Sequence, residues 1–88
     1  MSRAAAPAPV TEIDARDLLC PLPVLRLRKA LEAVAPGDRV TLIASDRMAL
    51  IDVPHFCAGA GHRLISVSDD GDLVRFQVER APSPAAGH

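Results

Sequence analysis

The chain has 88 residues, of which 49% are hydrophobic, and its formal net charge is −1. A chain of this length can bury one small core, so we expect a single domain. The small net charge excludes the strong positive field with which proteins bind nucleic acid or a membrane surface. The only aromatic side chains are two Phe, which also argues against direct nucleic-acid binding, because unpaired bases stack on aromatic rings.

Ala and Pro dominate both ends of the chain, in residues 1–9 and 81–88. Such segments offer little surface to bury, so we expect two disordered tails around a folded domain at residues 10–80. No stretch resembles a signal peptide or approaches the roughly 20 apolar residues that span a membrane. Two cysteines are too few for the disulfide framework of a small secreted fold. We therefore expect a soluble cytoplasmic protein with reduced thiols.

The first predicted elements are a strand and a helix. Residues 11–15 alternate between Thr, Ile or Ala and acidic residues, which predicts a short strand with Thr11, Ile13 and Ala15 toward the core. A helix beginning at Pro21 follows, because apolar residues recur at helical spacing at Val24, Leu27, Leu31 and Val34. The segment APGD, residues 35–38, ends this helix.

The next predicted elements are a central strand and a second helix. Residues 39–45, RVTLIAS, are β-branched and apolar, as expected inside a sheet. Residues 48–60 place one apolar stripe on a helix, formed by Leu50, Val53, Cys57 and Ala60. Pro54 either kinks this helix or lies in its first turn, in which case Asp52 caps a shorter helix. Gly61 is well placed to end it.

Two further strands are predicted on either side of the sequence DDGD. Residues 63–68 alternate in polarity, and within residues 73–79 three side chains face one way, Val74, Phe76 and Val78, so the pair forms a hairpin. The element order is therefore βαβαββ. It predicts a two-layer α/β sandwich, with two helices on one face of a four-stranded mixed sheet.

The segment DARDLLCPLPVLRLRKAL, residues 14–31, places Cys20 directly before the first predicted helix. If that helix begins at Pro21, Cys20 is its N-cap and its sulfur faces the N–H groups of the first turn. The helix dipole then lowers the thiol pKa from about 8.5 into a range of roughly 3.5 to 7.5, so the sulfur becomes a nucleophile. Pro21 and Pro23 stiffen the turn and leave the N–H groups of Leu22 and Val24 as donors to sulfur.

Other interpretations of these residues stand beside the chemical one. A cysteine is often a small buried core residue, and proline at a helix start is common. The basic side chains near Cys20 have a simple interpretation as a solvated surface, and beside a reactive thiol they are also candidates for partner docking or for raising the local positive potential. They are Arg16, Arg26, Arg28 and Lys29.

Cys57 and the histidines are predicted to be structural. Cys57 falls on the apolar stripe of the second helix, where a thiol acts as an inert small hydrophobe. Together with His55 and His62 it suggests a zinc site, but the spacing matches no standard ligand pair, so no metal is expected. His62 follows Gly61 and is expected to close the helix with a partly positive ring.

The segment around Cys20 resembles the signature of the TusA/SirA-like sulfur-carrier family, in which Asp-Ala-Arg-Gly-Leu leads into Cys-Pro-x-Pro and a basic amphipathic helix. The sequence IDVPHFCAGAGHRLIS, residues 51–66, is similar to that family's second helix and following strand. The resemblance implies that Cys20 carries sulfane sulfur as a persulfide, without a metal or organic cofactor. It also implies a cysteine desulfurase or similar donor, an acceptor protein in tRNA thiolation, molybdenum-cofactor maturation or sulfur oxidation, and thus a sulfurtransferase.

The sequence departs from the family signature at Asp17, where glycine is usual, and at residues 45–50, SDRMAL, in place of the more usual Asp-Pro or Asp-Asp helix start. We expect Asp17 to preserve a left-handed turn, because aspartate tolerates that geometry better than most residues, although its charge could alter the thiol. The second departure is interpreted as a variant cap. The alternative function is a non-catalytic regulatory or interaction module, with RNA association as one form of it.

Overall fold

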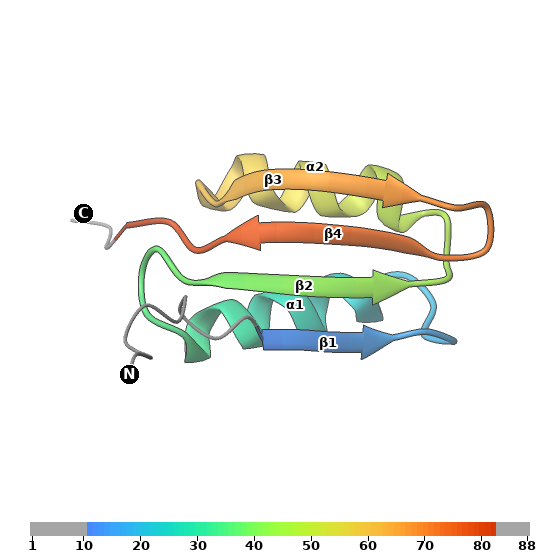
Figure 1. Ribbon diagram of the computed structural model, residues 1–88, viewed down its shortest axis with the longest axis horizontal. Helices are drawn as coiled ribbons and strands as arrows, with labels where there is room; N and C mark the ends of the chain where they lie inside the picture. The colour runs from blue at the N-terminus through green and yellow to red at the C-terminus, as the bar shows by residue number, and fades with distance from the viewer. Residues whose placement is uncertain (1–10, 83–88) are drawn as a thin grey trace, which may run out of the picture.

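A computed structural model describes residues 11–82, which form four strands and two helices in the order βαβαββ. The strands are β1 (Thr11–Ala15), β2 (Arg39–Ala44), β3 (Arg63–Asp69) and β4 (Val74–Glu79), and the helices are α1 (Leu22–Ala33) and α2 (Ala49–Ala60). Both helices lie on one face of the sheet, so the predicted two-layer α/β sandwich is confirmed (Figure 1). The predicted tails, 1–9 and 81–88, lie outside the described residues except for 81 and 82.

The sheet has the strand order β1-β2-β4-β3. β1 and β2 are parallel and joined by α1, whereas β4 runs antiparallel to both β2 and β3. A parallel pair needs a crossover such as a helix, and an antiparallel pair can be joined by a tight turn. The mixed sheet, the central position of β2 and the predicted hairpin of β3 and β4 are therefore confirmed.

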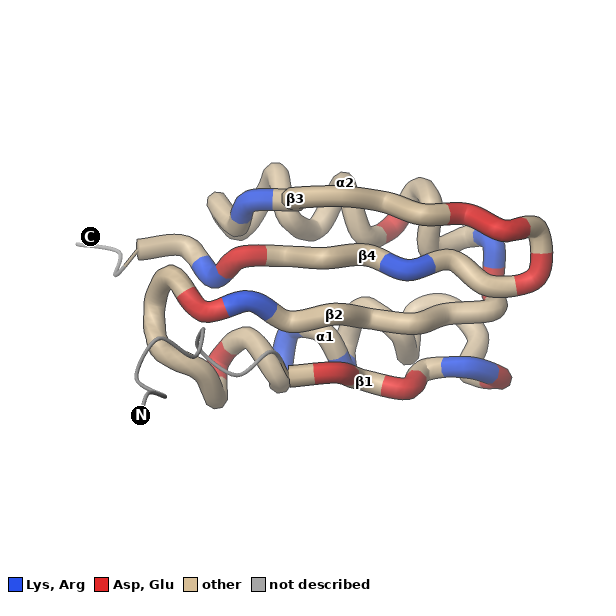
Figure 2. The backbone as a smooth tube through the Cα atoms, viewed as in Figure 1, with Lys and Arg blue, Asp and Glu red and all other residues tan. Residues whose placement is uncertain are grey.

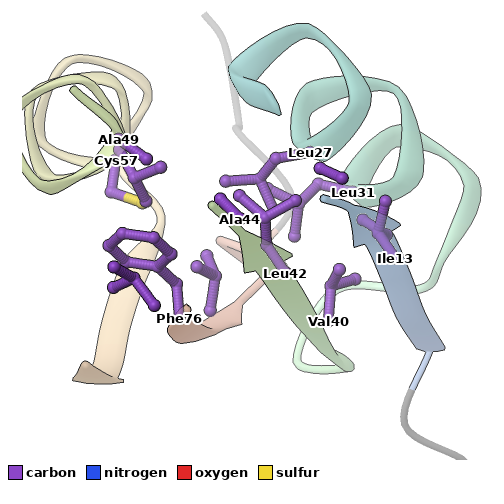
Figure 3. Close-up of a cluster of buried hydrophobic side chains, with 13 residues drawn as sticks. Ile13, Leu27, Leu31, Val40, Leu42, Ala44, Ala49, Cys57 and Phe76 are labelled. Carbon is purple, nitrogen blue, oxygen red and sulfur yellow. The ribbon is translucent and has the colours of Figure 1, made fainter. Parts of the chain in front are cut away.

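The core lies between the sheet and the two helices (Figure 3). Val74, Phe76 and Val78 of β4 are fully buried, as their alternation predicted. The predicted stripes on the helices are confirmed at every position but Ala60, because their half-buried residues also pack against the core. Leu27, Leu31, Val53 and Cys57 are buried, whereas Val24, Val34 and Leu50 are half-buried and Ala60 is exposed; in β1, Ile13 and Ala15 are buried but Thr11 is exposed.

α2 begins at Ala49 and includes Pro54, so neither the short helix nor an Asp52 cap is formed. The N-cap residue is Met48, which makes no side-chain cap bond, and its own N–H donates to Asp46 Oδ1 at 2.9 Å. The helix ends as predicted at Gly61, whose left-handed φ of 82° directs its N–H to the Cys57 carbonyl. Neither helix within residues 11–82 has the length and apolar character that a membrane crossing requires.

His62 and Arg80 anchor the segment after β4. The His62 Nδ1 accepts a hydrogen bond from the Ala81 N–H at 2.9 Å. Burial, together with the nearby charge of Arg80, lowers the pKa of His62, so the predicted positive ring at the end of α2 is wrong. Arg80 does at the end of α1 what was expected of His62 at the end of α2. Its guanidinium donates a hydrogen bond to the carbonyl of Val34, just after the last turn of α1.

Candidate active site

Of the two cysteines, Cys20 is exposed and Cys57 is buried. Cys57 retains only 2% of its accessible surface and lies in the core among the side chains of α2 and the sheet. Burial raises the pKa of its thiol, which keeps the sulfur protonated and unreactive. The predicted structural position of Cys57 is confirmed, and Cys20 is left as the thiol that another protein can reach.

The start of α1 differs from the prediction by one residue. The helix begins at Leu22 with Pro21 at the N-cap position, and the Cys20–Pro21 peptide bond is cis. Cys20 is therefore not the N-cap. The Leu22 N–H donates to the Leu19 carbonyl at 2.8 Å instead of to sulfur. Pro23, which was expected only to stiffen the turn, is buried on the core side of the helix.

The backbone of Cys20 is held by Asp46, from the loop between β2 and α2. The Cys20 N–H donates to Asp46 Oδ2 at 2.7 Å, while Asp46 Oδ1 accepts the Met48 N–H. These two hydrogen bonds lower the pKa of Asp46, the bond from Cys20 most of all. One carboxylate therefore joins the segment before α1 to the first turn of α2.

The thiol of Cys20 faces a second carboxylate. Its Sγ donates a hydrogen bond to Asp52 Oδ2 at 2.7 Å. This hydrogen bond is the largest cause of a raised Cys20 pKa, and partial burial and the negative charges of Asp52 and Asp46 act in the same direction. The predicted lowered pKa is wrong, because the groups nearest to the sulfur are anions and not helix N–H groups.

Cys20 and Asp52 line an open pocket of about 320 Å³, together with Pro21, Val24, His55 and Phe56. α1 and the loop before it form one wall, and α2 forms the other. The pocket is open to solvent on the side of Cys20 and Asp52, so the sulfur is accessible from outside the domain. Two of the predicted positioning residues, Pro21 and Val24, are thus beside the thiol, whereas Leu22 and Pro23 do not line this pocket.

Exposed apolar side chains flank the pocket residues in the sequence. Leu19 precedes Cys20 and is 69% exposed, and Ile51 precedes Asp52 and is 63% exposed. Leu22 and Met48, at the starts of the two helices, are both 46% exposed. These four side chains are apolar surface that the starts of the two helices leave exposed to solvent.

The four predicted docking residues do not form one group around the sulfur. Arg16 forms a two-pronged ion pair with Asp14, which lowers the pKa of that carboxyl to about 2. Arg28 pairs with Glu32 one turn along α1 at 3.5 Å. Arg26 and Lys29 are exposed on α1 and take part in no ion pair within residues 11–82. Charges of both signs are spread over the described chain, as Figure 2 shows.

Asp17 adopts the left-handed conformation that was expected of it, with a φ of 70°. Its N–H donates to the Ser45 Oγ at 2.9 Å, which fixes the turn that leads to Cys20. No basic side chain is among the causes of the Cys20 pKa shift, and neither is Asp17. An increase in positive potential at the thiol, which was one of the two roles considered for Arg16, Arg26, Arg28 and Lys29, is therefore not found.

Asp46 and Asp52 are the site residues that sequence reasoning missed. They lie 26 and 32 residues beyond Cys20 in the chain, so no local pattern connects them with the thiol. The available signal for Asp46 was its place three residues before the start of α2, in the segment that was interpreted as a variant cap. Among residues 11–82, no three His, Cys, Asp or Glu side chains come together in a way that could hold a metal ion.

Comparison with known proteins gives consistent results for sequence and for fold. Residues 11–80 match the model of the family described as "Sulfurtransferase TusA". The chain is 31% identical over 68 residues to the "Putative sulfur carrier protein YrkI" of Bacillus subtilis (strain 168), covering 77% of this chain and 91% of YrkI. The crystal structure of a SirA-like protein from Desulfitobacterium hafniense has the same fold, with a TM-score of 0.71. That likeness covers 83% of this chain and 99% of the other at 23% identity.

The family match spans all six elements of the fold and includes Cys20, Asp46 and Asp52. It therefore covers the whole sandwich together with the pocket between α1 and α2. On this sequence match, and with the fold in agreement, the chain belongs to the TusA sulfurtransferase family.

Proposed function

We propose that this protein is a cytoplasmic sulfur carrier that accepts sulfane sulfur on Cys20 as a persulfide. The observation that carries the proposal is the position of Cys20, an exposed thiol at the open pocket between α1 and α2 in a chain of the TusA family. The other thiol, Cys57, is in the core and out of reach of a partner protein. The resemblance to sulfur carriers supports a cysteine desulfurase or another protein persulfide as the donor.

Loading is a sulfur exchange between two proteins. The Cys20 thiolate attacks the outer sulfur of the donor's persulfide, so that a new S–S bond forms at Sγ and the donor's S–S bond breaks. The donor sulfur leaves as a thiolate and takes up a proton. Delivery is the same step with an acceptor thiolate attacking the outer sulfur on Cys20. No oxidant, metal or organic cofactor takes part in either exchange.

Exposed side chains beside the pocket and along α1 support direct contact with the partner proteins. Leu19 and Ile51 offer apolar contact area beside Cys20 and Asp52. Arg26 and Lys29 on α1 offer positive charge to an acidic partner, which would steer the encounter. We propose that these four side chains, and not the paired Arg16 and Arg28, contribute most to docking. The acceptors that the family resemblance suggests are those of tRNA thiolation, molybdenum-cofactor maturation and sulfur oxidation.

Sulfur uptake by the purified protein tests the proposal. The protein is incubated with a cysteine desulfurase and free cysteine, and its intact mass is measured before and after reduction. The wild type should gain the mass of one sulfur atom, which reduction removes. Cys20→Ser should gain nothing, and Cys57→Ala, folded at the temperature of the assay, should gain as much as the wild type.

The competing function is an interaction module without sulfur chemistry. If neither the wild type nor Cys57→Ala gains sulfur from a desulfurase or from inorganic polysulfide, that function becomes the better explanation. The rate of alkylation at Cys20 does not separate the two functions. Because the Cys20 pKa is raised, an empty carrier is expected to alkylate slowly as well.

A further inference from the structure

Asp52 makes a contact that the fold does not explain. It lies in the first turn of α2, but it does not cap that helix, because α2 begins at Ala49 and its N-cap residue is Met48. Within residues 11–82, the one hydrogen bond of its carboxylate comes from the Cys20 thiol. A carboxylate that favours the protonated thiol is the opposite of what a simple nucleophilic cysteine requires, since only the thiolate attacks.

We propose that Asp52 distinguishes the empty carrier from the loaded one: it holds the empty Cys20 as a protonated thiol and favours the departure of sulfur from the loaded Cys20. This inference rests on the proposed persulfide function. Its physical basis is that Sγ itself carries a proton only in the empty form. When Sγ bonds to a second sulfur it has no proton left to donate, so the contact with Asp52 Oδ2 is lost.

The balance between the two forms follows from this contact. In the empty form the carboxylate accepts a charge-assisted hydrogen bond, which is stronger than a neutral one. In the loaded form the same carboxylate faces a persulfide, whose outer sulfur is readily anionic, and like charges at this distance repel. Delivery restores the hydrogen bond, because the acceptor leaves with the outer sulfur and Sγ regains a proton. Asp52 therefore stabilises the product of delivery relative to its reactant.

The ionisable side chains that face Cys20 come from two segments. Asp52 and His55 belong to α2 and line the same pocket, and Asp46 belongs to the loop between β2 and α2. Asp46 is occupied by two backbone N–H groups and serves as an anchor. Among these groups, Asp52 alone contacts the sulfur. Its replacement by asparagine removes the negative charge while keeping the size of the side chain.

The first experiment needs no sulfur donor. The rate of alkylation of Cys20 by iodoacetamide is measured against pH for the wild type, Asp52→Asn and Asp52→Glu, each as Cys57→Ala to leave one thiol. We expect the midpoint, the pH at which the alkylation rate is half-maximal, to fall by about one unit in Asp52→Asn. At neutral pH this means about tenfold faster alkylation. Asp52→Glu should stay closer to the wild type, because it keeps the charge.

Glu32→Gln is the matched control for the loss of one negative charge. Glu32 is exposed near the other end of α1, about 15 Å along the helix from Leu22. At 0.1 M salt a charge at that distance is largely screened, so the midpoint should not move. An unchanged or higher midpoint in Asp52→Asn, with its thermal melt intact, would overturn the proposal even if sulfur uptake proceeds.

The second experiment measures delivery. The same variants are loaded with inorganic polysulfide, freed of excess reagent and mixed with glutathione, and the loaded fraction at equilibrium is read from intact mass. The equilibrium ratio of loaded to empty protein should be roughly three- to tenfold higher for Asp52→Asn than for the wild type or Glu32→Gln. Equal or weaker retention would contradict the inference. If no variant loads, the proposed carrier function fails as a whole, whereas the alkylation result still reports on the contact between Asp52 and Cys20.

Discussion

At the scale of single residues, the site is built by carboxylates that reach Cys20 from a distant part of the chain. The sequence was sufficient to single out Cys20 and to place it near the start of a helix. It could not predict the raised pKa, because Asp46 and Asp52 come close only when α2 packs beside α1. A motif reports local geometry, whereas the electrostatics of a thiol depend on every charge that the fold brings near it.

The left-handed conformation of Asp17 is expected to decide how substitutions at this position change stability. Its φ of 70° is costly for most side chains but not for glycine. We expect Asp17→Gly to leave the free energy of unfolding nearly unchanged and Asp17→Val to lower it by about 1–2 kcal/mol. Urea unfolding of the two variants checks this. Equal stability for the two would show that the left-handed turn is not maintained in solution.

At the scale of elements, hydrophobic periodicity predicted the existence, type and order of all six elements but not all their limits. In β4, Val74, Phe76 and Val78 alternate with polar residues, so the sequence was sufficient to predict that these three are buried. The ends of the helices could not be predicted in this way, because tertiary packing decides where a helix begins and ends. Pro23 enters the core at the start of α1, and Pro54 is accommodated inside α2 although its ring has no N–H to donate.

The exposed basic side chains of α1 are expected to affect the rate of sulfur transfer. Reversal of charge at Arg26 and Lys29 should slow sulfur transfer from a protein donor by about tenfold at low salt, because it removes electrostatic steering. The melting temperature should not change, since both side chains are exposed and take part in no ion pair among residues 11–82. Arg63→Glu on the outer strand β3 is the control, and an equal slowing by that variant would contradict a specific docking role for α1.

At the scale of the whole molecule, the sheet and helices form one sandwich whose two helix starts meet at the pocket that contains Cys20. α1 follows β1 and α2 follows β2, and the parallel β1–β2 pair directs both helices the same way across the sheet (Figure 1). This arrangement places the loop with Cys20 beside the first turn of α2. The topology itself was predictable from the element order, and the pocket between the helices was not, because it depends on their separation.

His62 makes the stability of the whole domain depend on pH. Burial lowers its pKa in the folded state below the ordinary value of 6.5, so the folded protein resists protonation that the unfolded chain accepts. Stability is therefore complete above about pH 6.5 and falls as the pH decreases toward the folded pKa. Urea unfolding at pH 7.5 and 5.5 should show this loss. His62→Gln should be less stable at pH 7.5 but should lose less between the two values; an equal loss in both proteins would exclude His62 as its source.

The most direct test of the account is to locate the transferred sulfur within the chain. The protein is loaded by a desulfurase with isotopically labelled cysteine, the persulfide is trapped by alkylation, and peptides are sequenced by mass spectrometry before and after an acceptor thiol is added. We expect the label on Cys20, none on Cys57, and its transfer to the acceptor. Label on Cys57, or label on Cys20 that no acceptor thiol removes, would contradict sulfur transfer through Cys20.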